Sequence, residues 1–81
     1  SDTKSKIRTF ILTTFLNGQD PSVLADDTSL ERAHIIDSAG MLELILFIEE
    51  NFGFQVDNDD AVPDNFDSVD AICSYVTRKQ A

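Results

Sequence analysis

An Asp–Ser pair, Asp37 and Ser38, is the part of this sequence whose residue types and position best suit chemistry. The pair stands where a loop is expected to become a long apolar helix. Asp and Ser favour the start of a helix, because their side-chain oxygens accept hydrogen bonds from backbone N–H groups that have no partner in the first turn. We therefore expect the Ser38 hydroxyl to be exposed and held in a fixed direction. Two interpretations stay open: an ordinary helix cap, or a hydroxyl that is presented to another protein.

The sequence around Ser38 does not support catalysis by this chain alone. A serine hydrolase needs a base and an orienting acid in contact with the nucleophile. The single histidine, His34, lies in the loop before Ser38, and the G-x-S-x-G nucleophile turn is absent. We expect a protein that is not an enzyme, with His34 as a polar loop residue.

Clustered acids raise the alternative of a metal site. Asp57 and Asp59 match the first two ligands of a calcium-binding loop, but the glycine and the glutamate that such a loop requires are replaced by Val62 and Ser68. Cys73 has no Cys or His partner at ligand spacing, and we expect it to be a small core residue. No dedicated metal site is predicted.

Composition predicts one small domain, residues 1–81, which is too short to enclose a deep catalytic cavity easily. The first residues are polar and mixed in charge, unlike a signal peptide. The longest apolar run, residues 44–48, is far shorter than the ~20 residues of a membrane span. A single cysteine fits a reducing compartment. We expect a soluble, cytoplasmic monomer.

Charge is distributed unevenly along the chain. Six Lys and Arg stand against fifteen Asp and Glu, a formal net charge of −9, and residues 33–77 contain no cation. Such a surface repels nucleic acid and anionic membranes, and it attracts proteins with basic patches. Solubility alone is the other explanation of the same charge.

Hydrophobic periodicity predicts an all-α fold. Apolar residues recur at helical spacing in residues 3–16, 38–52 and 69–78, and a short acidic helical turn is expected within residues 57–62. No segment alternates over enough length to form a strand. The prediction is three main helices and one short helix, with a long first connection. The apolar side chains that we expect to hold this connection in place are Val23, Leu24, Leu30, Ile35 and Ile36.

The middle helix has two apolar faces. The expected core face contains Met41, Leu44, Ile45, Ile48 and Phe52. The opposite face contains Ala39, Leu42 and Leu46, with Glu43, Glu49 and Glu50 at its border and Phe47 on its flank. Either the long connection covers this second face, or it is an apolar strip that is open to a partner. The position of Ser38 at the start of the strip favours an open surface.

Taken together, these residues resemble the acyl carrier protein family. The resemblance depends on Asp37-Ser38, Leu42-Glu43-Leu44-Ile45, Ile48-Glu49-Glu50-Asn51-Phe52 and Val56 at the family's spacing. The stretch Phe66-Asp67-Ser68-Val69 is similar to the one that opens the family's last helix. The similarity extends over roughly residues 3–79, nearly the whole chain.

The resemblance implies a four-helix bundle that carries cargo and has no catalytic activity. A separate, magnesium-dependent phosphopantetheinyl transferase would join 4′-phosphopantetheine from coenzyme A to Ser38, and Asp37 would help it to engage the site. The arm would carry an acyl or aminoacyl group as a thioester. Loading ligases and downstream enzymes of fatty-acid, polyketide or nonribosomal-peptide type biosynthesis would dock through basic patches. The docking surface that the resemblance implies contains Ala39, Leu42, Glu43, Leu46, Phe47 and Glu50.

Several residues depart from the fatty-acid carriers. Ala39 and Gly40 follow the serine in place of the usual Leu and acidic or polar residue, and His34-Ile35-Ile36 replaces the usual lead-in to Asp37. Asp-Ser-x-Gly is more similar to stand-alone carriers of amino acids, such as D-alanyl and freestanding peptidyl carriers, so whether the cargo is acyl or aminoacyl stays open. Two other functions also stay open: a non-covalent acidic interaction domain with a carrier-like fold, and a calcium or magnesium sensor.

Overall fold

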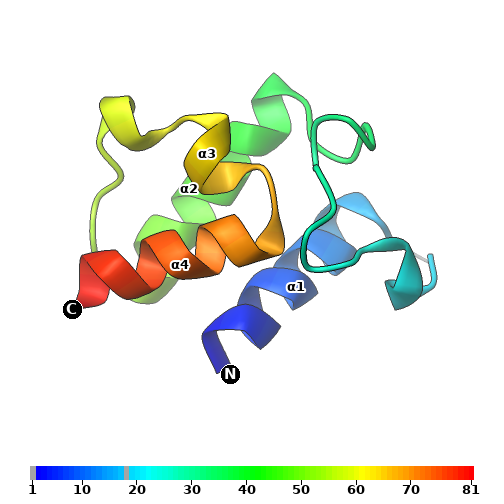
Figure 1. Ribbon diagram of the computed structural model, residues 1–81, viewed down its shortest axis with the longest axis horizontal. Coiled ribbons are helices and arrows are strands. Elements are labelled where there is room, and N and C mark those ends of the chain that lie inside the picture. Colours follow the sequence, from blue (N-terminus) through cyan, green and yellow to red (C-terminus); the bar gives the residue numbers. More distant parts are fainter. Residues whose placement is uncertain (1, 18) are drawn as a thin grey trace.

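The computed structural model describes residues 2–17 and 19–81, and this part of the chain forms four α-helices with no strand (Figure 1). The helices are α1 (Asp2–Phe15), α2 (Ser38–Phe52), α3 (Pro63–Phe66) and α4 (Val69–Gln80). Single 3-10 turns lie at Pro21–Val23 and Asn58–Asp60. The predicted all-helical class and a small helical bundle are thereby confirmed. Within the described ranges, no helix has the length and apolar character needed to cross a membrane.

The three long helices start and end close to their predicted limits, because local capping residues set these limits. The Asp37 side chain caps α2, and Gly53 ends it in the left-handed conformation at φ 76°. Ser68 caps α4, since its side chain accepts a hydrogen bond from the Ala71 N–H at 3.0 Å. Asn17-Gly18 in the sequence predicts the end of the first helix, and Gly18 lies outside the described residues.

The short fourth helix lies later in the chain than the sequence indicated. The expected acidic turn is present as the 3-10 turn Asn58–Asp60, but α3 follows it and begins at Pro63. Proline suits the first position of a helix, because its missing N–H would have no helical partner there. Pro63 therefore starts a helix of its own and does not merely follow the acidic turn.

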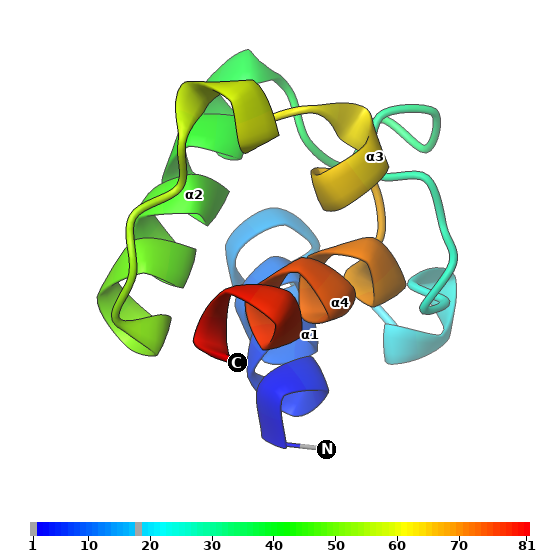
Figure 2. The same ribbon diagram turned by 60° about the vertical axis from the view of Figure 1, so that its left-hand side comes forward.

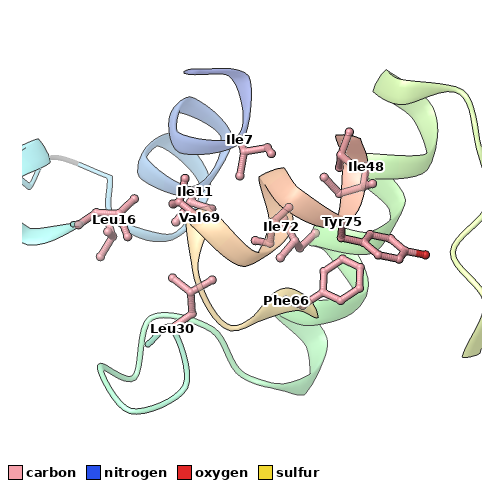
Figure 3. Close-up of a cluster of buried hydrophobic side chains, with 12 residues drawn as sticks. Ile7, Ile11, Leu16, Leu30, Ile48, Phe66, Val69, Ile72 and Tyr75 are labelled. Carbon is pink, nitrogen blue, oxygen red and sulfur yellow. The ribbon is translucent and has the colours of Figure 1, made fainter. Parts of the chain in front are cut away.

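The core is built around α4, which runs through the middle of the bundle and contacts α1, α2 and α3 (Figure 2). Figure 3 shows Ile7 and Ile11 of α1 on one side of Val69 and Ile72, with Ile48 and Phe66 on the other side. The fully buried side chains of this core are Ile7, Ile11, Leu24, Leu30, Leu44, Ile48, Phe66, Val69, Ile72 and Val76. Each such side chain contributes roughly 1.5–3 kcal/mol to folding.

The long connection between α1 and α2 is held in place by buried side chains, as predicted, with one exception. Leu24 and Leu30 are buried, and Ile35 and Ile36 are half-buried. Val23 is 45% exposed, so its prediction as an anchor was wrong. It ends the 3-10 turn that begins at Pro21, and the chain turns inward only at the next residue.

Ion pairs tie the same connection to α1. Arg8 contacts the Asp26 carboxylate at 3.0 Å and donates to the Leu24 carbonyl at 2.6 Å. Lys4 bridges Asp26 and Asp70 at 3.4 and 2.9 Å, and the hydrogen bond with Asp70 is the first cause of the raised pKa of Lys4. Half of the chain's six cations lie on α1, and two of these three are used to hold the first loop.

Candidate functional site

Ser38 is the first residue of α2, and its side chain is exposed. The preceding Asp37 is the helix cap, since its Oδ1 accepts a hydrogen bond from the Gly40 N–H at 2.8 Å. Within the described residues, no hydrogen bond involves the Ser38 hydroxyl. The capping role therefore belongs to the acid, and the serine oxygen is available at the positive end of the helix dipole.

Gly40 lets α1 approach the first turn of α2 closely. It is buried, and a Cβ atom built there would lie 2.8 Å from Cε1 of Phe15 and 3.3 Å from Cγ2 of Ile36. A side chain of any size would have to push the Phe15 ring away. A glycine at this position thus has a structural reason, which is the packing of Phe15 against the first turn of α2.

A groove of about 580 Å³ opens beside Ser38. Three segments line it: the end of the first loop, the first turn of α2, and the segment that contains α3. The lining residues are Leu30, Glu31, Ile36, Asp37, Ser38, Met41, Ala61, Val62, Pro63, Phe66 and Asp67. Most of them are apolar, while Glu31, Asp37 and Asp67 place carboxylates at the groove. The exposed Ser38 therefore stands next to a mostly apolar groove with an acidic border.

Hydrogen bonds from Asp67 hold the loop wall of the groove. Its Oδ2 accepts from Ser29 Oγ at 2.6 Å, its Oδ1 accepts from the Glu31 N–H at 3.0 Å, and its backbone carbonyl accepts from the Leu30 N–H at 2.8 Å. From the sequence alone, the position of Asp67 shortly before the last helix indicates only a possible helix cap. No local signal could have revealed its role, because its partners lie 36 to 38 residues earlier in the chain.

The opposite wall, formed by residues 61–63, is held by Asp60. The Tyr75 hydroxyl donates to Asp60 Oδ2 at 2.9 Å, and Asn65 Nδ2 donates to the Asp60 carbonyl at 2.9 Å. Burial of the Tyr75 side chain, followed by its hydrogen bond to Asp60, raises the pKa of the phenol from 10.0 to about 12. Figure 3 shows the Tyr75 hydroxyl pointing away from the buried cluster, beside Phe66.

The outer face of α2 is open to solvent. Leu42 is 65% exposed and Leu46 is 57% exposed, so the first loop does not cover the second apolar face. Ala39, Glu43 and Glu50 are also exposed. We call the surface formed by Ala39, Leu42, Glu43, Leu46 and Glu50 the α2 strip.

Phe47, the sixth residue that the resemblance placed on the docking surface, lies differently from the other five. It is half-buried, and its ring stacks on Phe10 with centroids 4.1 Å apart and an interplanar angle of 15°. Glu49, at the border of the same face, accepts a hydrogen bond from the Val56 N–H at 2.8 Å. Phe47 therefore joins α2 to α1, and Glu49 holds the chain after α2. The α2 strip, which contains neither residue, is the more exposed surface.

The remaining candidates of the sequence analysis lie apart from any shared site. His34 is exposed and adopts a left-handed backbone conformation at φ 57°. Cys73 is half-buried against the core. Over residues 2–17 and 19–81, no group of three or more His, Cys, Asp or Glu side chains has an arrangement suited to a metal ion. The span with partial similarity to a calcium loop folds instead as a 3-10 turn followed by α3.

Comparison with known proteins adds no family assignment: no protein-family model matches the chain, and no curated protein matches it. The site must therefore be interpreted from its own geometry and from the resemblance described above.

Proposed function

We propose that this protein is a stand-alone carrier of the acyl carrier type, with a 4′-phosphopantetheine arm attached to Ser38. The arm would hold an acyl or aminoacyl group as a thioester for delivery to biosynthetic enzymes. The observation that carries this proposal is the exposed Ser38 hydroxyl at the first position of a fifteen-residue helix whose cap is supplied by Asp37. A serine that merely ended the loop would be expected to make the capping hydrogen bond itself.

The position of Ser38 at the start of α2 supports a phosphate ester there. The positive end of the α2 dipole favours a phosphodiester at this position. In the attachment step, Ser38 Oγ forms a bond to the pantetheine-side phosphorus of coenzyme A, and the P–O bond of the pyrophosphate breaks. The nucleotide half leaves as adenosine 3′,5′-bisphosphate, and the hydroxyl proton passes to a base of the transferase. The arm then supplies a terminal thiol for the cargo.

The α2 strip supports the second half of the proposal, docking to other proteins. Leu42 and Leu46 offer apolar contact, and Glu43 and Glu50 offer carboxylates to a basic partner. Complementary charge accelerates association and selects the partner more than it prolongs the complex. This suits a carrier, which must visit a transferase, a loading ligase and a consuming enzyme in turn.

The test is attachment itself. Incubation with coenzyme A, magnesium and a broad-specificity phosphopantetheinyl transferase should add the mass of one phosphopantetheine group to the wild type and none to Ser38→Ala. Ser74→Ala, which removes an exposed hydroxyl from α4, is the matched control and should be labelled like the wild type. A wild type that gains no mass, or a Ser38→Ala variant that gains it, would contradict the proposal. Screening adenylating ligases against the labelled protein would then separate acyl from aminoacyl cargo.

A second candidate function is non-covalent binding of a basic protein through the α2 strip. The observation that favours it is that the exposed strip and its carboxylates do not depend on any modification of Ser38. This function predicts no labelling by the transferase, together with binding that weakens as salt concentration rises.

A further inference from the structure

Asp67 connects two parts of the chain that both border the Ser38 groove. It lies between α3 and α4, and it accepts three hydrogen bonds from the stretch Ser29–Leu30–Glu31 of the first loop. The buried side chains of Phe66 and Val69 on either side fix its position in the core. Asp67 is thus held in place by its buried neighbours, and the first loop is hydrogen-bonded to it.

The effect of this tie reaches the start of α2 through Leu30. The Leu30 N–H donates to the Asp67 carbonyl at 2.8 Å, and the Leu30 side chain is fully buried. The Leu30 carbonyl accepts from the Ile35 N–H at 2.9 Å and from the Ile36 N–H at 3.3 Å. Ile36 directly precedes Asp37, the cap that holds the first turn of α2. A continuous set of hydrogen bonds therefore leads from Asp67 to the residue before the cap.

The same residues line the groove on two sides. Leu30 and Glu31 line the wall formed by the loop, and Phe66 and Asp67 line the wall formed by α3 and the residue after it. The three hydrogen bonds to Asp67 join these two walls directly. Without them, the loop could move away from α3, and both the groove and the direction of Ser38 would change.

We propose that Asp67 is a positioning residue for the modification of Ser38, acting through the loop that it holds. The inference rests on the proposed carrier function. Reaction at a hydroxyl depends steeply on its placement, and a misplacement of about 1 Å can lower a rate by roughly a hundredfold. Asp67 is not one of the residues of the α2 strip, so its loss should slow the transfer step and leave docking through that strip unchanged.

Four variants distinguish positioning by the hydrogen bonds of Asp67 from an effect of its negative charge. Asp67→Ala removes both side-chain acceptors. Asp67→Asn removes the charge but retains an oxygen for the Glu31 N–H and an amide that can donate to Ser29 Oγ. Ser29→Ala removes one side-chain bond alone, and it replaces Asp67→Ala if that variant does not fold. Asp64→Ala removes an exposed acid from α3, the short helix that precedes Asp67, and is the control for charge.

The experiment measures steady-state pantetheinylation of the wild type and the variants below their melting temperatures. We expect Asp67→Ala to lower kcat by about tenfold or more, with KM for the carrier within about twofold of the wild type. Ser29→Ala should show a smaller loss of the same kind, while Asp67→Asn and Asp64→Ala should remain close to the wild type. Amide exchange at Glu31 and Ile36 should accelerate in Asp67→Ala and not in Asp64→Ala.

Three outcomes for the variants would contradict the inference. An unchanged kcat in Asp67→Ala, or in Ser29→Ala where it has to serve as the replacement, overturns it. A raised KM at constant kcat would make Asp67 a docking residue, and an Asp67→Asn variant as slow as Asp67→Ala would make its charge the cause. If the wild type takes no label, the carrier function and this inference are both overturned. If the wild type is labelled and Asp67→Ala has an unchanged kcat, the inference alone is overturned.

Discussion

The two faces of α2 use the same kind of side chain for different purposes. On the inner face, Leu44 and Ile48 are fully buried against α4 and its neighbours. On the outer face, Leu42 and Leu46 are 65% and 57% exposed. Burial of apolar area stabilises the fold, while exposed apolar area contributes only when another molecule covers it. The difference teaches that the inner face holds the bundle together and that the outer face is available for recognition.

Polar groups follow the same division. Inside the bundle, the Tyr75 hydroxyl is paired with Asp60, and among the described residues no buried side-chain N or O atom is left without a partner. On the α2 strip, Glu43 and Glu50 are exposed. The cations Lys4 and Arg8 are instead used on α1, where they hold the first loop. Glu43 and Glu50 thus give the exposed strip an acidic character.

The largest expected effect is the loss of an inner-face side chain. Ile48→Ala should lower the free energy of unfolding by about 2–5 kcal/mol, because it leaves a cavity beside α4. Leu46→Ala, on the outer face of the same helix, should change it by less than about 0.5 kcal/mol. Urea unfolding followed by circular dichroism measures both values. Equal effects of the two substitutions would remove the distinction between the faces.

A second prediction concerns the buried phenol. The pKa of Tyr75 is raised from 10.0 to about 12 by burial and by the Asp60 hydrogen bond, so the folded protein retains this proton over a pH range in which the unfolded chain has lost it. The stabilising effect is complete below pH 10 and is lost as pH rises towards 12. The wild type should thus lose about 2–3 kcal/mol of stability more than Tyr75→Phe over this interval. Unfolding curves recorded at a series of pH values measure the difference, and parallel curves for the two proteins would show that the phenol is not responsible.

A third prediction tests the boundary between the two regions at Gly40, which is buried two residues after the exposed Ser38. Gly→Ala inside a helix ordinarily stabilises by roughly 1 kcal/mol. Here the new methyl group would meet the Phe15 ring at 2.8 Å, and we expect a net destabilisation of about 1–3 kcal/mol. Thermal unfolding measures the change. In a Phe15→Leu background, Gly40→Ala should destabilise the protein less than it does in the wild type. A gain in stability from Gly40→Ala in the wild type would contradict the close contact.

These local features differ in how well the sequence revealed them. The limits of α2 were predictable, because Asp37 and Gly53 act on their immediate neighbours. The two apolar faces of the helix followed from its periodicity. Sequence alone could not decide whether the long connection covered the outer face, since that depends on where a loop lies in space; the structure shows Leu42 exposed.

The walls of the groove were the part that the sequence could not give. Residues 61–67 reach Ser38 only after the chain has passed through α2 and turned back, and Asp67 meets the first loop across 36 to 38 positions. A residue of this type before a helix normally indicates a cap, and Ser68 takes that role. Asp67 shows how an acid with an ordinary local explanation can have its main contacts elsewhere in the fold.

A small change in stability is expected for a substitution on the outer face of α2, and it tests whether this face is a docking surface. Leu42→Asp should alter the free energy of unfolding by no more than about 0.5–1 kcal/mol, since Leu42 is 65% exposed and Asp is only a slightly poorer helix former than Leu. The same change should raise KM for the transferase several-fold. Because it adds a negative charge, which favours a basic partner, any loss of affinity must come from lost apolar contact. Glu43→Gln, as the complementary change, should weaken docking mainly at low salt. A large fall in the melting temperature of Leu42→Asp would instead show that the strip is part of the core.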